Sequence, residues 1–280
     1  MPSFNNPALI CDLHCHSIYS YDGFLTVESL IRDCGRKRIN CIAITDHDCI
    51  GLSEEEKAQI EKGGIACIVG CEISTDSGAH IIGLFIRSLP ERRDAGSIAD
   101  HIVAQNGLIL IPHPFRDSTG FLRQYRENPS CIEYVLERAS FIELYNGKYE
   151  LPSERQKIRD LASRFGLRLI AASDAHKSWD VGRLVTTFNS LGPDTQIRSR
   201  LLTGEIEMYA TAQPQADTGR MLRRIDDFRL SPHYAYIIGL IPPYIRKAIK
   251  QIIYKYKYDQ YQRTCIDIGP QEAINIQRLE

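Results

Sequence analysis

ALICDLHCH, residues 8–16, is an apolar run that ends in two histidines. His14 and His16 stand two positions apart on a predicted strand, so both side chains project from the same face. Two imidazoles at one strand end can chelate one metal ion. Asp174 and His176 repeat this spacing after a late apolar run, where they are placed to close the site from the opposite side. The two segments therefore predict a repeated unit in which a strand is followed by metal-ligand residues.

Short apolar runs recur along the chain, and each ends at a polar cluster. They cover residues 8–13, 41–45, 65–70, 80–86, 108–112, 141–145 and 169–172, and the helix-like stretches between them cover 26–36, 54–62, 97–105, 130–138 and 153–165. Strands that alternate with helices predict an α/β fold with a parallel sheet. Polar clusters after the strands are typical of α/β barrels. We expect a closed or distorted barrel of about seven strands in preference to an open sheet.

The alternation fades after about residue 201. We predict a barrel domain over residues 1–205 and a C-terminal extension over 206–280 that is partly helical and basic. Within this extension, residues 244–258 interleave lysines with tyrosines. We favour an amphipathic helix that packs on the barrel or at a dimer contact over one that binds nucleic acid or an anionic lipid surface.

Net charge, cysteine content and the lengths of the apolar runs limit the class of protein to which the chain can belong. The 280 residues carry a net charge of −1, so no global basic field favours non-specific nucleic-acid binding. The nine cysteines include no CxxC pair and predict a reduced, cytoplasmic chain without a disulfide framework. Residues 1–10 show no signal peptide, and no apolar run has the length of a membrane span.

Metal-ligand residues gather in five short clusters that hold six of the eight histidines. Imidazole together with carboxylate suits Zn, Mn and Fe. The nine predicted ligands exceed the needs of one ion, and they would serve three divalent ions while leaving positions open for water and substrate. Among them we assign catalytic importance to Glu72, which has two oxygens and can bridge two ions, and to His47 and Asp174. The predicted ligands are His14, His16, Asp22, His47, Glu72, His80, His113, Asp174 and His176.

Acidic neighbours of these clusters have a further predicted role. Asp46 and Asp48 flank His47, and Asp12 precedes the first cluster. A ligating histidine usually donates its other N–H to a carboxylate or carbonyl, so we expect these three acids to orient histidines. His101 and His233 are expected to be ordinary surface or packing residues.

Taken together, the motifs resemble the polymerase-and-histidinol-phosphatase (PHP) superfamily. The resemblance covers about the first 190 residues and implies a distorted (β/α)7 barrel with a trinuclear Mn, Fe or Zn site that hydrolyses phosphoesters. All nine ligand positions of active members are filled, although Tyr21 replaces the usual serine before the Asp-Gly pair. The resembling segments are DLHCHSIYSYDG (12–23), ITDHD (44–48), GCEI (70–73), HIIGLF (80–85), IPHP (111–114), ELYNG (143–147) and SDAH (173–176).

Charge favours a phosphate substrate. Three divalent ions, three carboxylates and one bridging hydroxide leave a net of about two positive charges, which match a phosphate dianion. We expect hydroxide held between the ions to attack phosphorus in line. Arg116, Arg183 and Lys148 follow the clusters and are candidates to bind the phosphate, since a guanidinium grips it bidentately.

The favoured substrate is a nucleotide or a short oligonucleotide phosphate, because the resemblance is closest to small stand-alone members that act on such compounds. Some of those carry an extra domain between the histidines that match His80 and His113, and this chain lacks it. The alternatives are a histidinol-phosphatase-like monoesterase, a non-catalytic accessory module and a metal-dependent amidohydrolase. The partner we expect is a small phosphorylated substrate, without a stable nucleic-acid complex.

Overall fold

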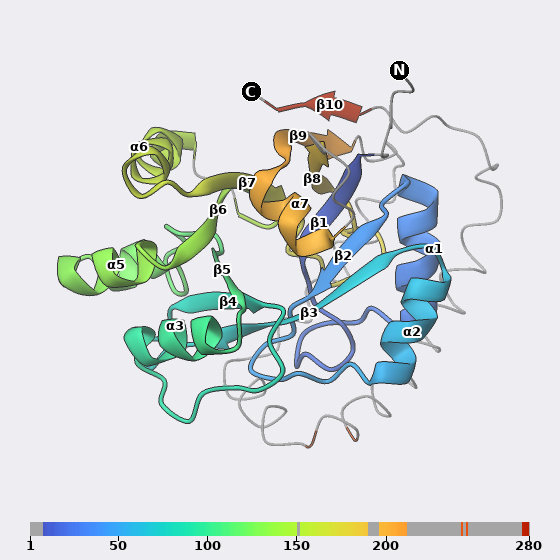
Figure 1. Ribbon diagram of the computed structural model, residues 1–280, viewed down its shortest axis with the longest axis horizontal. Coiled ribbons are helices and arrows are strands. Elements are labelled where there is room, and N and C mark those ends of the chain that lie inside the picture. Colours follow the sequence, from blue (N-terminus) through green and yellow to red (C-terminus); the bar gives the residue numbers. More distant parts are fainter. Residues whose placement is uncertain are drawn as a thin grey trace, which may run out of the picture.

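The structure is a computed structural model that describes residues 8–149, 152–189, 196–211 and 276–279, together with residues 242 and 245. In this part the chain forms an α/β fold around a curled ten-stranded sheet (Figure 1), so the predicted class is confirmed. The sheet order is β10-β9-β8-β1-β2-β3-β4-β5-β6-β7. The strands are β1 (Leu9–Cys15), β2 (Cys41–Ile44), β3 (Ala66–Ser74), β4 (His80–Leu84), β5 (Leu108–Ile111), β6 (Ala139–Asn146), β7 (Arg168–Ala172), β8 (Leu184–Asn189), β9 (Glu205–Thr211) and β10 (Ile276–Arg278).

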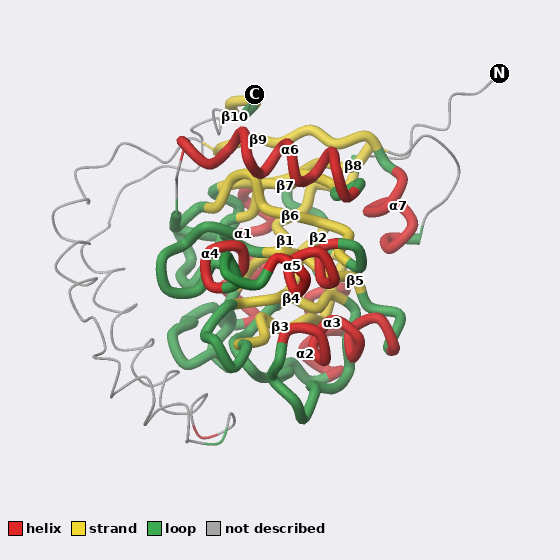
Figure 2. Tube along the Cα trace, turned by 90° about the vertical axis from the view of Figure 1, so that its left-hand side faces the viewer, coloured by secondary structure: helices red, strands yellow, loops and turns green. Residues whose placement is uncertain are grey.

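Helices cover the strands from two sides. In Figure 1, α1 and α2 lie together on one side, whereas α3, α5 and α6 lie on the other, where Figure 2 shows them stacked. Local sequence sets the helix starts: Thr26 accepts a hydrogen bond from the Ser29 N–H, and Ser53 forms a capping box with Glu56. The described helices are α1 (Val27–Lys37), α2 (Glu54–Lys62), α3 (Ala95–Ala104), α4 (Phe121–Gln124), α5 (Pro129–Leu136), α6 (Arg155–Phe165) and α7 (Ile197–Thr203).

The direction of β4 departs from the expected parallel sheet. β1, β2 and β3 pair in parallel, as do β5, β6 and β7, but β4 is antiparallel to both β3 and β5. Only residues 75–79 separate β3 from β4, and a parallel connection needs a dozen or more residues. The reversal has a consequence for the site, because His80 begins β4 at the edge where the parallel strands end.

The curl of the sheet brings the ends of β1 and β7 together. The His16 N–H donates to the Ala175 carbonyl at 2.7 Å, and the Ala175 N–H donates to the His14 carbonyl at 3.1 Å. Farther from the site, the Ala171 N–H donates to Thr186 Oγ1 on β8 at 2.8 Å. These contacts place ligand residues from the first and last predicted strands side by side. The count of seven β/α units stays a prediction.

Three strands that the sequence did not indicate extend the sheet beyond β1. β8 and β9 are antiparallel neighbours, and β10 pairs with β9 over three residues, Ile276–Arg278. The division at residue 205 and the helical extension stay predictions. Residues 244–258, apart from Ile245, and His233 lie outside the described residues.

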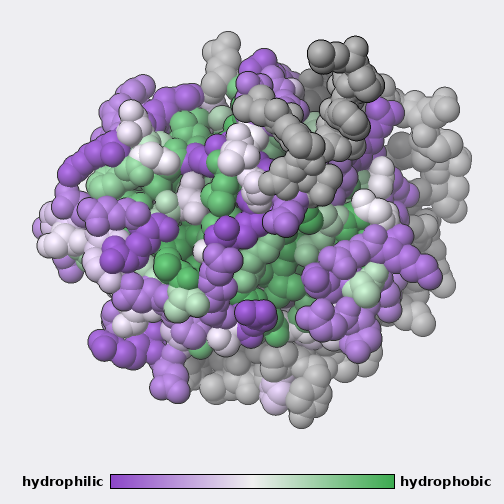
Figure 3. All heavy atoms as spheres, in the orientation of Figure 1, coloured by the Kyte–Doolittle hydropathy of each residue, from purple (hydrophilic) through white to green (hydrophobic). Residues whose placement is uncertain are grey.

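Apolar side chains fill both surfaces of the curled sheet. Leu13, Leu110, Phe141, Ile170 and Phe188 belong to one buried cluster. On the outer surface, strand residues pack against Ile98 and Ile102 of α3 in a second cluster. Figure 3 shows polar side chains over the helices, with apolar side chains visible between them. None of the described helices combines the length and apolar character that crossing a membrane requires.

Candidate metal centre

All nine predicted ligand residues meet at one edge of the sheet. His14 lies on β1 and Glu72 on β3, His80 begins β4, and the others follow strand ends. Their ligand atoms form four overlapping groups in which the atoms lie within 4.8 Å of one another. The groups are His16–Asp22–His47–His176, His14–Glu72–His113, His14–His16–Asp174 and His47–Glu72–His80.

Glu72 is the carboxylate at the middle of this cluster. Its side chain is 1% exposed, and both oxygens face imidazoles. Oε1 lies 2.7 Å from His80 Nδ1 and 2.9 Å from His113 Nε2. Oε2 lies 3.1 Å from His14 Nε2, 3.2 Å from His16 Nε2 and 3.4 Å from His47 Nδ1. This position suits a carboxylate that bridges two ions.

Asp174 and Asp22 are the other two carboxylates among the predicted ligands. Asp174 Oδ1 lies 3.4 Å from His16 Nε2 and 3.6 Å from His14 Nε2. Asp22 Oδ2 lies 3.0 Å from His176 Nε2 and 3.4 Å from His47 Nε2. Asp174 therefore faces two histidines from the end of β1, whereas Asp22 faces two histidines from different loops.

The residues fit divalent metal ions. Both ring nitrogens of His16, and Nδ1 of His47 and of His113, are buried, and among the described residues none makes a hydrogen bond of good geometry with them, although carboxylate oxygens lie 3.2 to 3.4 Å from His16 Nε2 and His47 Nδ1. Buried polar atoms are nearly always paired, so these imidazole nitrogens inside a carboxylate cluster fit residues that would hold metal ions. Mixed imidazole and carboxylate donors suit Zn, Mn and Fe. The identity and number of the ions stay expectations.

The electrostatics keep the carboxylates ionised. Burial by itself raises the pKa of Glu72, but His80, His14 and His47 hold it well below its usual value. Burial lowers the pKa of His14, and the charges of Asp174 and Glu72 outweigh this and raise it well above its usual value. Ionised carboxylates are the form that binds metal ions, whereas a bound ion would have to displace the extra protons that the raised pKa places on the histidines.

Comparison with known proteins supplies the family. The family model described as the PHP domain matches residues 12–268. The chain belongs to the PHP domain family. It is therefore a metal-dependent phosphoester hydrolase of the PHP superfamily.

Similar proteins include two bacterial enzymes that are matched over short segments. A 5'-3' exoribonuclease of Haemophilus influenzae is 41% identical over 76 residues, which are 26% of this chain and 27% of that protein. A 3',5'-nucleoside bisphosphate phosphatase of Chromobacterium violaceum is 40% identical over 78 residues, which are 27% of each chain. The chain thus matches only about a quarter of the length of either enzyme.

A solved structure supports the fold of this PHP chain. It is a two-domain protein of Bacteroides vulgatus that contains a predicted PHP-like metal-dependent phosphoesterase. The TM-score is 0.56 at 23% identity, and the match covers 73% of this chain and 65% of the other.

Asp12 and Asp48, which were expected to orient histidines of the metal centre, bind other groups instead. Asp12 accepts the N–H groups of Ser173 and Gly182 at 3.0 and 2.8 Å. Asp48 accepts hydrogen bonds from Ser74 and Arg93. The prediction was wrong for both, because adjacency in sequence does not turn a carboxylate toward a neighbouring ring. Asp46 binds the N–H and hydroxyl of Ser17, both at 2.6 Å.

Glu143 is the site residue that the sequence reasoning did not assign. It lies on β6, is 1% exposed, and accepts hydrogen bonds from His14 Nδ1 and from the His113 N–H. The available signal was a charged residue inside the apolar strand FIELYN, since an unpaired charge is rarely buried.

Tyr21, which replaces the usual serine, stacks on His47 with ring centroids 4.8 Å apart.

The three predicted phosphate-binding residues occupy different surroundings. Arg116 Nη2 donates to Asp174 Oδ2 at 2.7 Å and to Asn146 Oδ1 at 3.3 Å, so the guanidinium borders the metal centre. Lys148 Nζ is 2.6 Å from Asp180 Oδ2. Arg183 is exposed between β7 and β8. Their roles as phosphate ligands stay predictions. Among the contacts of the described residues, the one between Arg116 and Asp174 joins a candidate phosphate-binding residue to a predicted metal ligand.

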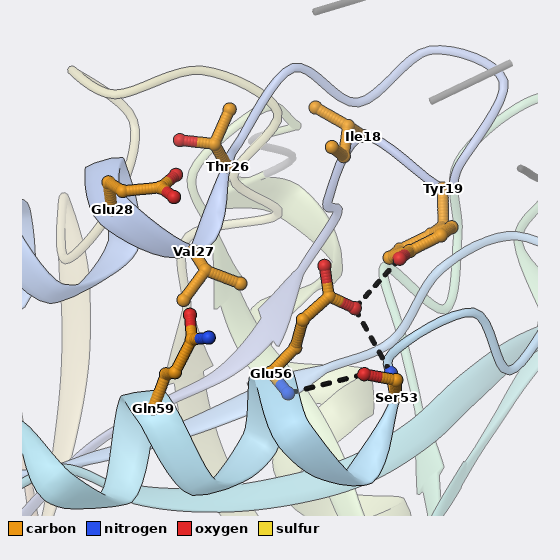
Figure 4. A pocket seen from close by; sticks show the side chains of 8 residues that line it. All are labelled: Ile18, Tyr19, Thr26, Val27, Glu28, Ser53, Glu56 and Gln59. Atoms are coloured by element: carbon orange, nitrogen blue, oxygen red, sulfur yellow. Dashed lines mark hydrogen bonds between the residues drawn. The ribbon is translucent and has the colours of Figure 1, made fainter. Parts of the chain in front are cut away.

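A separate pocket lies beside the first residues of α1 and α2 (Figure 4). It has a volume of about 440 Å³, and no predicted metal ligand lines it. Tyr19 donates its hydroxyl to Glu56 Oε2 at 2.7 Å, and the same oxygen accepts the Ser53 N–H at 3.1 Å. The pocket residues are Ile18, Tyr19, Thr26, Val27, Glu28, Ser53, Glu56 and Gln59.

Proposed function

We propose that this PHP phosphoesterase hydrolyses a nucleotide or short oligonucleotide phosphate. The observation that carries the proposal is the convergence of all nine predicted ligands in four overlapping groups. Divalent ions bound there, three by our expectation, would polarise a phosphoryl oxygen and lower the pKa of a bound water. The proposal includes the distorted (β/α)7 arrangement that the family resemblance implies.

Residues of the chain have separate roles in binding the ions and in binding the phosphate. Glu72 and Asp174 would each hold metal ions, and His47 belongs both to the group that contains Glu72 and to the group that contains Asp22. Arg116 is held by Asp174 at the border of the cluster, where its other N–H groups can bind phosphate oxygens. Because the Arg116 side chain is only 24% exposed, its charge is poorly screened by solvent.

Arg116 also supports a nucleotide as the substrate. Its guanidinium lies over the ring of Tyr149, 5.7 Å from the centroid, so a cation and an aromatic ring stand together beside the centre. Arginine and tyrosine are the residues on which phosphates and bases are commonly bound. The names of the exoribonuclease and the bisphosphate phosphatase point to the same class of substrate.

The rival proposals make different demands on the same residues. A histidinol-phosphatase-like monoesterase would use the same centre on a smaller phosphate ester. A non-catalytic accessory module has no need of a complete ligand set, which disfavours it. An amidohydrolase shares the first His-x-His motif, but it has no need of Arg116 at the border of the centre.

Hydrolysis by the purified, manganese-loaded protein tests the proposal. The panel comprises a 3',5'-bisphosphonucleotide, short RNA and DNA oligomers, histidinol phosphate, an aryl phosphate and an N-acyl amino acid. We expect turnover of a nucleotide or oligonucleotide that stops on chelation. Turnover of histidinol phosphate alone would select the monoesterase, and turnover of the amide alone would select the amidohydrolase. Silence across the panel with metal bound would contradict the proposal and favour the accessory module.

A further inference from the structure

Glu143 receives three hydrogen bonds from three different parts of the chain. Its Oε1 lies 2.8 Å from His14 Nδ1. Its Oε2 accepts the His113 backbone N–H at 2.7 Å and Asn146 Nδ2 at 2.8 Å. All three of these hydrogen bonds come from the protein, and Glu143 is not a member of the four ligand groups.

The contact with His14 determines which ring nitrogen faces the metal cluster. An ionised carboxylate only accepts hydrogen bonds, so Glu143 keeps a proton on His14 Nδ1, and in the neutral ring Nε2 is then the nitrogen with the lone pair. Nε2 is the atom that lies 3.1 Å from Glu72 Oε2 and 3.6 Å from Asp174 Oδ1. Glu143 therefore selects the tautomer of His14 that can ligate an ion.

The contact with His113 acts on the backbone. His113 has a φ of 26°, in the left-handed region that non-glycine residues rarely adopt. Its N–H points at Glu143 Oε2, and its Nε2 lies 2.9 Å from Glu72 Oε1. The hydrogen bond favours the backbone conformation in which this imidazole reaches the cluster.

We infer that Glu143 is the positioning residue of the His14–Glu72–His113 group, which it holds through one ring and one backbone N–H. The inference rests on the proposed function, because it assumes that this group binds a metal ion. Hydrogen-bond partners of metal ligands commonly contribute 10- to 100-fold to metal affinity, and we expect an effect in about that range.

Glu143→Gln is the decisive substitution, because an amide has one acceptor end and one donor end. If the amide oxygen faces His113 and Asn146, the NH₂ group faces His14 Nδ1 and favours the tautomer that cannot ligate. If the oxygen faces His14, the NH₂ group meets two donors. Asn146 cannot reverse its own amide to compensate, since its Oδ1 already accepts the N–H groups of Lys148 and Tyr149.

Glu56→Gln is the matched control. Glu56 also accepts two hydrogen bonds, from Tyr19 and Ser53, but it lines the pocket of Figure 4 and belongs to none of the four ligand groups. A third variant, Glu143→Asp, keeps the charge but is too short to reach both His14 and His113.

The probe is Co²⁺ bound to the full chain, followed by its visible absorption, by metal content and by competition with a chelator. We expect Co²⁺ affinity to fall about 10- to 100-fold in E143Q and less in E143D, with an altered spectrum, while E56Q matches the wild type. A merely structural role would lower the unfolding temperature without changing the spectrum of the folded protein.

Three outcomes would overturn the inference. Wild-type affinity and spectrum in folded E143Q would show that Glu143 does not position the ligands. Failure of both Glu143 variants to fold would assign it to folding alone. Absence of Co²⁺ binding by the wild type would remove the metal centre itself, and with it the proposed function; the first two outcomes leave that function standing.

Discussion

The metal centre and the pocket of Figure 4 use the same loop, residues 17–25, in opposite ways. Asp22 from this loop joins a cluster in which Glu72 is 1% exposed and surrounded by imidazoles. Ile18 and Tyr19 from the same loop line an open pocket in which Glu56 caps α2. Both regions contain acids, but in the described part of the chain only the carboxylates buried among imidazoles belong to the four groups that could hold a metal ion. A sizeable hollow is thus a poorer guide to chemistry here than a dense cluster of charged groups.

The largest expected effect is the loss of a metal ligand. Asp174→Asn keeps the shape of the side chain but removes its charge from the cluster. We expect phosphoester hydrolysis by the manganese-loaded protein to fall about a thousandfold or more, because metal catalysis contributes several kcal/mol. Initial rates measure this, with E56Q as the variant from the pocket. A D174N rate within tenfold of the wild type would contradict the assignment of the centre.

Arg116→Ala tests the border of the centre. Hydrogen bonds to charged groups contribute about 1.5–3 kcal/mol, so we expect kcat/KM to fall roughly 10- to 150-fold. Arg116→Lys should recover only part of the loss, since lysine lacks the planar fork. Arg126, which is 68% exposed and pairs with its neighbour Glu127, is the matched control. Equal effects of R116A and R126A would show that Arg116 has no special role.

The pH dependence of stability should differ between the metal-free and the metal-loaded protein. The lowered pKa values of Asp22, Glu72 and Asp174 stabilise the fold above their ordinary values of 3.8 to 4.5, and this is lost as pH falls through the folded values. The raised pKa values of the histidines, His14, His47 and His176, stabilise it below 6.5, and this is lost as pH rises through the folded values.

Metal-free protein should therefore have its highest unfolding temperature between about pH 4.5 and 6.5. Added Mn²⁺ should reverse the decline above pH 6.5, because neutral imidazole is the form that binds metal. Thermal unfolding at a series of pH values, with and without the ion, checks this. A metal-free unfolding temperature that keeps rising from pH 6 to 9 would show that the histidines do not share protons with the carboxylates.

The smallest effect belongs to the pocket. Ser53→Ala removes the capping box of α2 and should cost about 1 kcal/mol of folding free energy, without changing kcat/KM. Denaturant unfolding and the hydrolysis assay measure the two quantities. A loss of activity at unchanged stability would mean that the pocket also takes part in catalysis.

Much of the centre could be predicted because its ligands follow apolar runs. His14, Glu72 and Asp174 lie at or near the ends of strands that were expected from the apolar runs in the sequence. Strand ends meet at one edge of an α/β sheet, so sequence position translates directly into proximity. The reversal of β4 did not disturb this, because it moved the beginning of that strand to the same edge.

Partners that depend on the curl of the sheet could not be predicted. Glu143 meets His14 across 129 positions of sequence, and Arg116 meets Asp174 across 58. Nothing in local periodicity encodes which side chain of one strand faces which side chain of another. Asp12 shows the reverse case, since it is next to the first cluster in sequence but binds the backbone of Ser173 and Gly182.

The short strand β10 determines how a C-terminal truncation would affect the edge of the sheet. It covers the outer edge of β9 by pairing with residues 209–211, and Arg278 adds an ion pair to Glu207 at 3.0 Å. A chain cut before Ile276 would expose the N–H and C=O groups of that edge, which are a template for another strand. Shortened versions should therefore self-associate unless the edge carries a new charge or proline, and solubility screening would be better started from chains that retain residues 276–279.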